Sequence, residues 1–180
     1  MAVRRQEVIM FHPVKALILV ALLLGSEAVL SACGGPSQAP AQDTPLELVI
    51  LRDVQPLWGG RNIYLLGDGR LFVQIVARGA QETRYALRVE PAKVEELASL
   101  LREHRFMQIE IEDRPGMPDE ARPEIEVTWQ SGAHKAVAKW ANDTHPDFDV
   151  IYAWLIELAE SVADQIPVYV GPYEEDWRPE

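Results

Sequence analysis

Cysteine is nearly absent from this sequence, because Cys33 is the single cysteine among 180 residues. A disulfide within one chain and a zinc site built from several thiolates are therefore excluded. A domain exported from the cytoplasm would have to be held together by its own apolar core. That is feasible for a domain of about 120 residues.

Basic residues are also scarce, with 17 Lys and Arg against 28 Asp and Glu and a formal net charge of −11. So acidic a surface repels the phosphates of nucleic acids and the headgroups of anionic lipids. We therefore expect no nucleic-acid partner. Any attachment to a membrane has to come from outside the folded part.

A long hydrophobic run is missing as well. The most apolar stretch, Ala16–Leu24, is much shorter than the roughly 20 residues that a membrane-spanning helix needs. Arg4, Arg5 and Lys15 precede it, and a charged region before a short apolar region is typical of a secretory signal peptide. The alternative, a retained anchor helix, would place Glu27 in hydrocarbon, where a carboxylate is costly.

The apolar run is followed by small residues and then the lone cysteine, in the order Leu30-Ser31-Ala32-Cys33. This segment resembles the lipobox of bacterial lipoproteins, although Glu27 is an unusual neighbour. The resemblance implies cleavage before Cys33, a diacylglyceryl thioether on its sulfur, and acylation of the new amino group by a fatty acid such as palmitate. Two or three acyl chains make a durable anchor, whereas one chain is marginal. In a two-membrane cell, Gly34 after the cysteine resembles the pattern of outer-membrane lipoproteins.

Four segments follow from these signals. We expect a signal peptide at 1–32, a lipidated flexible tether at 33–45, a single domain at 46–165, and an acidic extended tail at 166–180. The tether has the sequence GGPSQAPAQDTP after the cysteine, and a flexible chain of that length has an end-to-end distance of roughly 20 Å. The expected location is the cell membrane or the outer membrane, with the domain outside the cytoplasm.

Short β-prone runs bounded by turn residues predict the strands, at 46–54, 62–66, 70–76, 82–89, 124–130 and 133–140. Around Gly67-Asp68-Gly69 we expect one face with Tyr64, Leu66, Leu71 and Val73, and the other with Ile63, Leu65, Phe72 and Val76. A two-residue turn at Ser131-Gly132 would pair Gln130 with Ala133, Thr128 with Lys135, Trp129 with His134 and Glu124 with Lys139.

Apolar residues at helical spacing predict helices from Pro91 through His104 and from about Thr144 to Ala163, the second capped by Thr144 with Asp147 in its first turn. The fold class is therefore α+β, an antiparallel meander of five to six strands with two helices on one face. A hairpin followed by a helix occurs twice. Trp129 and Leu155 lie on apolar stripes, so we expect both to be buried.

The body, over residues 46–163, resembles small uncharacterised hairpin-plus-helix domains of bacterial lipoproteins. The Gly67-Asp68-Gly69 turn and the proline that opens the last helix carry this resemblance. It implies no catalytic residue.

No motif for a nucleophile, a metalloprotease or a phosphate-binding loop is present in the sequence. Ser131 and His134 are close, but Ser131 is a turn residue. The loop Asn142–Asp147 holds oxygen and nitrogen ligands for a metal, although helix capping explains it better. Acidic residues between Glu110 and Glu126 lack the spacing of a calcium site. We therefore expect no catalytic residue, metal or cofactor.

Aromatic residues outside the predicted core are the candidate binding residues: Trp58, Tyr169, Tyr173 and Trp177. Aromatic rings beside polar groups stack on sugars or anchor protein partners. Alternatively, the three tail residues fold back over the sheet and only cover it.

The expected function is a non-enzymatic, membrane-tethered binding or interaction module, with an envelope protein or a glycan as partner. One alternative is an enzyme inhibitor or assembly factor that presents a rigid loop, with the candidate loops Leu57-Trp58 and Met117-Pro118. A second is an envelope hydrolase, which would need His134, His145 and an acid to converge in one pocket.

Overall fold

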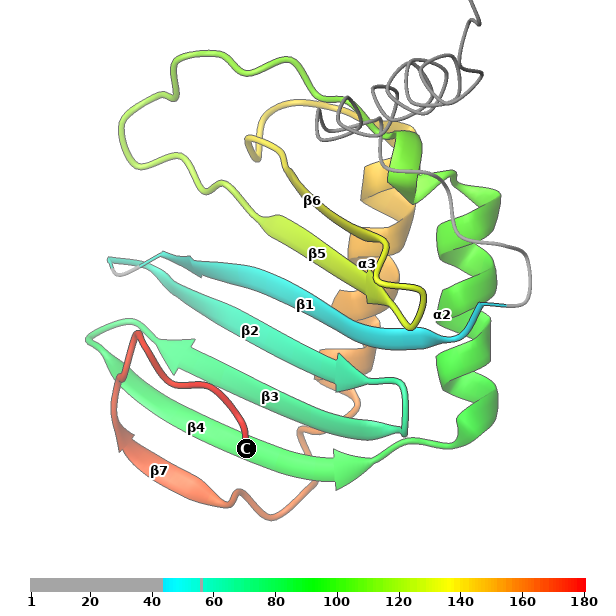
Figure 1. The fold of residues 1–180 in the computed structure, drawn as a ribbon. Coiled ribbons are helices and arrows are strands. Elements are labelled where there is room, and N and C mark those ends of the chain that lie inside the picture. The colour runs from blue at the N-terminus through cyan, green and yellow to red at the C-terminus, as the bar shows by residue number, and fades with distance from the viewer. Residues whose placement is uncertain (1–43, 56) are drawn as a thin grey trace, which may run out of the picture. The chain divides into compact units, whose positions relative to one another are not determined.

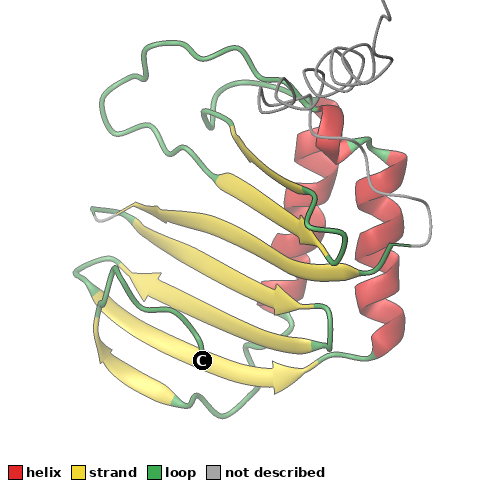
Figure 2. Ribbon diagram, viewed as in Figure 1, coloured by secondary structure: helices red, strands yellow, loops and turns green. Residues whose placement is uncertain are grey.

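The structure, a computed structural model, describes residues 44–55 and 57–180. The signal peptide and the lipid-bearing Cys33 that the sequence predicts lie outside these described residues. Within them, no helix is long and apolar enough to cross a membrane. The described chain forms a seven-stranded antiparallel sheet with two helices on one face, which confirms the predicted α+β class with more strands than expected (Figures 1 and 2).

The first four strands form a meander: β1 (Leu46–Gln55), β2 (Gly59–Leu66), β3 (Arg70–Ala77) and β4 (Gln81–Arg88). Helix α2 (Pro91–Glu103) and a short 3-10 turn η1 (Phe106–Gln108) follow. The second hairpin, β5 (Glu124–Trp129) and β6 (His134–Ala138), leads into helix α3 (Pro146–Glu160) and strand β7 (Tyr169–Pro172). The strand order is β6-β5-β1-β2-β3-β4-β7, so the second hairpin joins the meander by pairing β5 with β1.

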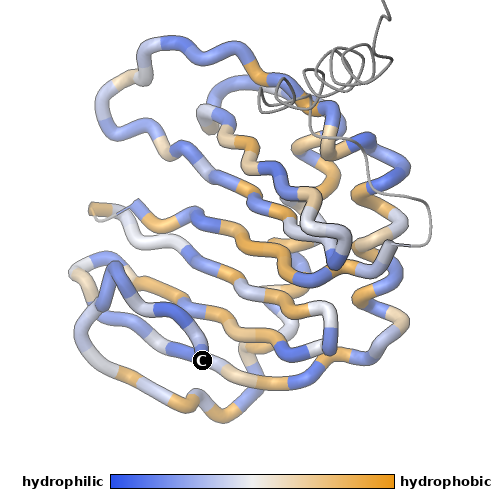
Figure 3. Tube along the Cα trace, viewed as in Figure 1, coloured by the Kyte–Doolittle hydropathy of each residue, from blue (hydrophilic) through white to orange (hydrophobic). Residues whose placement is uncertain are grey.

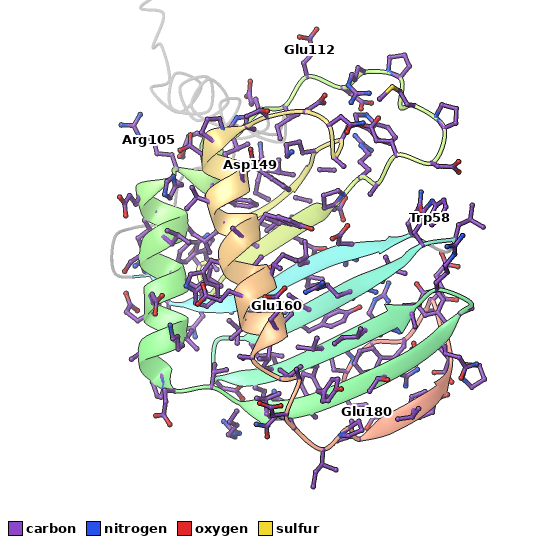
Figure 4. All side chains as sticks on the ribbon, turned by 180° about the vertical axis from the view of Figure 1, so that it is seen from behind. Trp58, Arg105, Glu112, Asp149, Glu160 and Glu180 are labelled. Carbon is purple, nitrogen blue, oxygen red and sulfur yellow. The ribbon has the colours of Figure 1, made fainter. Side chains whose placement is uncertain are left out.

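The core lies between the sheet and the two helices, which cover the same face of it when seen from behind (Figure 4). Polar and apolar residues alternate along much of the strands (Figure 3), and the buried apolar residues of the strands form one core with those of the two helices. Trp129 is 1% exposed and Leu155 is 0% exposed, so both are buried as predicted. Each fully buried side chain of this size contributes roughly 1.5–3 kcal/mol.

The register of the first hairpin differs from the prediction. Ile63 pairs with Val73 and Tyr64 with Phe72, so Ile63 and Leu65 share the helix face. The turn has three residues, with Gly69 at φ +86° and its N–H donating to the Leu66 carbonyl at 2.9 Å. A turn of three residues places Leu65 opposite Leu71, so the expected grouping of Leu65 with Phe72 and of Tyr64 with Leu71 is wrong.

The second hairpin is shifted by one residue, because its turn has three residues and not the expected two. Thr128 pairs with His134, and Glu124 pairs with Ala138. The N–H of Trp129 donates to the carbonyl of Ala133 at 2.9 Å across a turn that contains Gly132 at φ +82°. The predicted pairs of Trp129 with His134 and of Glu124 with Lys139 are therefore wrong.

Lys139 consequently does not face the glutamates of β5. It is only 6% exposed, and its ammonium lies 3.2 Å from the Asp149 carboxylate of α3. The ammonium also donates to the main-chain carbonyl of Asp143 at 2.5 Å. A buried ammonium needs such partners, because desolvation without them is costly.

The cap of α3 is His145 and not Thr144 as expected. The imidazole Nδ1 of His145 accepts the N–H of Phe148 at 3.4 Å, and the Asp149 carboxylate accepts the N–H of His145 at 3.1 Å. Pro146 is the first helical residue, a position that suits proline, so the preceding residue becomes the cap. Asp147 lies in the first turn as predicted.

The tail from 166 onward is extended, but part of it is a strand of the sheet. In β7, Tyr169 pairs with Arg84 and Val170 pairs with Thr83. The last residues then turn back across the face of the sheet that has no helices (Figure 1). We call this the open face.

Candidate binding site

A row of polar residues crosses the open face, one from each of four neighbouring strands. Arg52 lies opposite Asn62, Asn62 opposite Gln74, and Gln74 opposite Arg84. The row continues to Glu124 of β5 beside Arg52 and to Tyr169 of β7 beside Arg84. The sequence prediction missed this row, because it becomes visible only when the hairpin register is known.

Hydrogen bonds join the residues of the row into a network. Arg52 Nη1 donates to Glu124 Oε1 at 2.9 Å and to Glu126 Oε2 at 2.6 Å. Asn62 Nδ2 donates to Gln74 Oε1 at 2.8 Å, and Gln74 donates in turn to the carboxylate of Glu82. Glu82 also contacts Arg84.

The middle of this network is buried, since Gln74 is 0%, Glu82 1% and Arg84 8% exposed. The C-terminal segment provides the cover. The carboxylate of Glu174 lies 2.5 Å from Arg84, and the main-chain N–H of Glu174 donates to Glu82 at 3.2 Å. The Gln74 amide donates to the Glu174 carbonyl at 3.1 Å, so Gln74, Glu82 and Arg84 all have partners within the chain, although the Nε atom of Arg84 has none among the described residues.

Two of the predicted binding residues hold this cover in place. The guanidinium of Arg84 lies 4.3 Å from the ring centre of Tyr169 and 4.6 Å from that of Trp177. Trp177 also meets Tyr64 edge to face, with ring centres 5.6 Å apart. Cation–π and edge-to-face contacts of this kind are favourable. Trp177 therefore folds back over the sheet, the alternative that the sequence left open, while Tyr169 contacts Arg84 from the edge strand β7.

A cleft of about 380 Å³ lies on the open face beside this cover. Strands β1 and β2 contribute Arg52, Asn62 and Tyr64, and the loop before β5 contributes residues 120–122. The C-terminal segment contributes Tyr173, Glu175, Asp176 and Arg178. Tyr173 is thus the one predicted binding residue that lines the cleft.

The loop side of the cleft is built around Arg114. This guanidinium donates to both oxygens of Glu120, at 3.1 and 2.7 Å, and to Asp143 at 2.8 Å. Trp140 donates its indole N–H to the Arg114 carbonyl at 2.9 Å. The hydrogen bonds from Arg114 lower the pKa of Glu120 to about 2.

The acidic stretch around this loop therefore binds its own arginines. Glu120 and Asp143 pair with Arg114, while Glu124 and Glu126 pair with Arg52. Within residues 44–55 and 57–180, no cluster of three or more potential metal ligands is present.

Several side chains of the cleft keep unused hydrogen-bonding capacity. Tyr173, Glu175 and Asp176 make no side-chain hydrogen bond or ion pair within the described part of the chain. Burial, together with the neighbouring Glu175, raises the pKa of the Tyr173 hydroxyl. Among the described residues, Arg178 donates to two main-chain carbonyls, of Trp177 at 2.7 Å and of Glu175 at 3.4 Å, and pairs with no carboxylate.

Trp58 belongs to a separate surface, at the end of the sheet away from the helices (Figure 4). It is 52% exposed and its neighbour Leu57 is 64% exposed. The guanidinium of Arg78 lies 4.5 Å from the ring centre of Trp58. We call these three residues the tip.

The histidines that a hydrolase would need lie on opposite faces of the sheet. His134 Nε2 lies 3.0 Å from Glu126 on the open face. His145 caps α3, which packs on the other face. The structure does not bring them together.

Fold and site together define a class, a small α+β domain whose sheet is covered by helices on one face and carries a polar cleft on the other. No family model, no curated protein and no solved structure matches the chain. The function is therefore argued from the site itself.

Proposed function

We propose that this protein is a non-enzymatic binding module of the bacterial cell envelope, tethered to a membrane through lipid on Cys33, and that it binds its ligand in the cleft of the open face. The observation that carries the proposal is the cleft itself. Its volume of about 380 Å³ lies in the range of small-molecule sites. Its lining combines the aromatic side chains of Tyr64 and Tyr173 with polar groups that have no side-chain partner in the described part of the chain.

The arrangement of the candidate catalytic groups supports binding over hydrolysis. The imidazole of His134 contacts Glu126, and the imidazole of His145 caps α3. The Ser131 hydroxyl accepts a hydrogen bond from the N–H of Ala133 at 3.4 Å within its turn. A general base has to lie within hydrogen-bond reach of its nucleophile, and these groups have other roles.

An inhibitor or assembly factor is the second candidate, and the tip favours it. Leu57 and Trp58 are large apolar side chains on a turn, and aromatic anchors dominate protein interfaces. Met117, on the other candidate loop, is 54% exposed. Either surface would have to enter the cleft of a partner enzyme.

Site-specific photocrosslinking in the native cells tests the proposal. A benzophenone amino acid replaces Glu175 in the cleft, Trp58 at the tip, or the exposed Glu103 of α2 as the matched control, in the full chain. We expect a defined adduct from position 175 and none from position 103. An adduct from position 58 alone would favour the inhibitor. Equal labelling at all three positions, or none at 175, would refute a specific cleft.

A further inference from the structure

The charged side chains around the cleft fall into two groups. The first group is already neutralised: Arg52 by Glu124 and Glu126, and Glu120 by Arg114. Asp53 lines the same cleft, but its carboxylate accepts the Tyr152 hydroxyl at 2.6 Å from the helix side. These groups hold the walls together and are not available to a ligand.

The second group is available, and it holds charges of both signs. Among the described residues, the carboxylates of Glu175 and Asp176 have no hydrogen-bonding or ion-pair partner, and Arg178 pairs with no carboxylate. Arg122 pairs with Asp113, whose side chain is 72% exposed, and lies 5.2 Å from the ring centre of Trp140; an exposed ion pair of this kind is weak, so a ligand can replace it. An anion bound to the arginines would lie beside two carboxylates, and a cation bound to the carboxylates would lie beside two guanidinium groups. Like charges at such a site oppose binding, so available groups of both signs disfavour an ionic ligand of either sign.

A neutral ligand rich in hydroxyl groups uses both kinds of partner at once. Each hydroxyl donates to a carboxylate and accepts from a guanidinium N–H. Hydrogen bonds to charged partners are stronger than those between neutral groups. The lining of the cleft therefore suits a polyhydroxylated molecule.

Tyr173 adds a surface for the ring of such a ligand. Its side chain is half-buried, and its hydroxyl makes no hydrogen bond to the described residues. Its main-chain N–H donates to the Ala80 carbonyl at 2.9 Å, which holds the residue against the β3–β4 turn. A tyrosine so placed offers an apolar face for the C–H groups of a sugar ring and a polar end for one of its hydroxyls.

The cleft is also formed in advance. Its loop side is held by Arg114 with Glu120 and Asp143, and its floor by Arg52 with two glutamates. A ligand therefore does not have to order these walls, which lowers the entropic cost of binding. A volume of about 380 Å³ is near the lower end of small-molecule sites, which suits about one or two sugar rings.

We propose that the cleft is a saccharide site for neutral sugars, in which Tyr173 stacks on the ring and Glu175, Asp176 and Arg178 bind its hydroxyls. This inference rests on the proposed function, since it names the ligand class of the same cleft. It also sets a selectivity order, with neutral sugars bound better than acidic or basic ones.

The test uses the full lipidated chain in a polyoxyethylene detergent, because glycoside detergents carry the proposed ligand themselves. Trisaccharides of glucose and of N-acetylglucosamine serve as neutral probes, galacturonic acid trisaccharide as the acidic probe, and glucosamine trisaccharide as the basic probe. Calorimetric titration gives the affinities, and amide chemical shifts locate the site. We expect a neutral probe to bind at least tenfold more tightly than both charged probes, with shifts in residues 173–178.

Two sets of variants separate a binding role from a structural one. Tyr173→Ala should weaken neutral-sugar binding about tenfold, and Tyr173→Phe should weaken it less. The double variant Glu175→Gln, Asp176→Asn removes the two carboxylates and should raise affinity for the acidic probe relative to the neutral ones. Glu103→Gln on α2 is the control and should change neither affinity. A purely structural role for these residues would not reverse the selectivity.

The outcomes distinguish the two proposals. Failure of every neutral probe to bind, or charged probes that bind as tightly, would overturn the saccharide site. If a non-sugar adduct still formed at position 175, the binding module would stand with another ligand class. Absence of both sugar binding and the adduct would overturn both proposals.

Discussion

Arg84 shows how single residues decide the open face. Its guanidinium contacts Glu82 and Glu174 and lies between the rings of Tyr169 and Trp177. At 8% exposure it would be a costly unpaired charge without these partners. The C-terminal segment therefore completes the sheet, and two residues first considered as binding aromatics serve to hold that segment.

The first prediction at this scale concerns the tether. Replacing Cys33 by alanine removes the thiol that the lipobox resemblance assigns to the diacylglyceryl group. We expect the variant to be unlipidated and poorly processed, and radiolabelled palmitate to be absent from it. The wild-type chain, labelled in parallel, is the positive control. Label in the alanine variant would contradict the lipoprotein assignment.

The second prediction concerns Glu120, whose pKa is lowered to about 2 mainly by hydrogen bonds from Arg114. A carboxylate with a lowered folded-state pKa stabilises the fold above its unfolded pKa of about 4.3, and this contribution is lost as the pH falls toward 2. Glu120→Gln should therefore lower the urea midpoint clearly at pH 6. The difference from wild type should shrink steadily below pH 4.

The exposed Glu103→Gln provides the control for this comparison. Its urea midpoint should follow that of the wild-type chain at both pH values, because the Glu103 side chain is exposed and makes no hydrogen bond within the described part of the chain. If the urea midpoint of Glu120→Gln remained as far below that of the wild-type chain at pH 2.5 as at pH 6, the carboxylate charge would not stabilise the loop.

At the scale of the elements, α3 supplies the centre of the core. Leu155 is 0% exposed, while Val150 of the same helix is 43% exposed. Leu155→Ala should lower the free energy of unfolding by about 2–5 kcal/mol, through lost burial and a residual cavity. Val150→Ala is the matched control and should change it by about 0.5 kcal/mol or less. Denaturant unfolding measures both, and a Leu155→Ala cost below that of the control would contradict this packing.

Strand β7 and the segment after it depend on the contacts of Trp177. Trp177→Ala removes the ring that meets Tyr64 and Arg84, and should cost about 1–3 kcal/mol. Hydrogen exchange should show the loss locally, as faster exchange of amides 169–177 with little change in α2. Unchanged protection in β7 would mean that strand pairing alone holds the tail. Because these residues complete the sheet, deletion of residues 166–180 would disturb the fold as well as the cleft and would not test binding alone.

Element positions were largely predictable, whereas strand partners were not. Pro91 and Pro146 mark the helix starts, and the alternation in 82–89 marks β4, because these signals are local. The register of the second hairpin was predicted one residue off and the faces of the first were assigned wrongly, since turns of two and of three residues that contain glycine look alike in the sequence. That single residue decides which side chains share a face.

At the scale of the whole molecule, the prediction separates binding from hydrolysis. The variant combines His134→Ala with His145→Asn, because asparagine keeps the cap of α3 that alanine would remove. If the protein binds in its cleft, this variant should keep the crosslinked adduct from position 175 and its sugar affinity. Loss of a general base would instead lower a hydrolytic rate by about a hundredfold or more.

The comparison requires variants with matched melting temperatures. Trp58→Ala is the companion variant, and it should leave the adduct from position 175 intact, because the tip and the cleft are lined by different residues. An adduct that depends on the histidines in a folded variant would overturn the binding proposal.

By itself, the sequence determined the α+β class, the positions of both helices, and the burial of Trp129 and Leu155, because local periodicity and capping specify these features. The sequence also predicts attachment to a membrane, because the lipobox-like segment is a contiguous motif that needs no tertiary structure to be recognised. Only the tertiary structure decided the register, the row of polar residues and the cleft. These depend on contacts such as that of Arg84 with Glu174, which are 90 positions apart, and no local pattern encodes which distant groups meet.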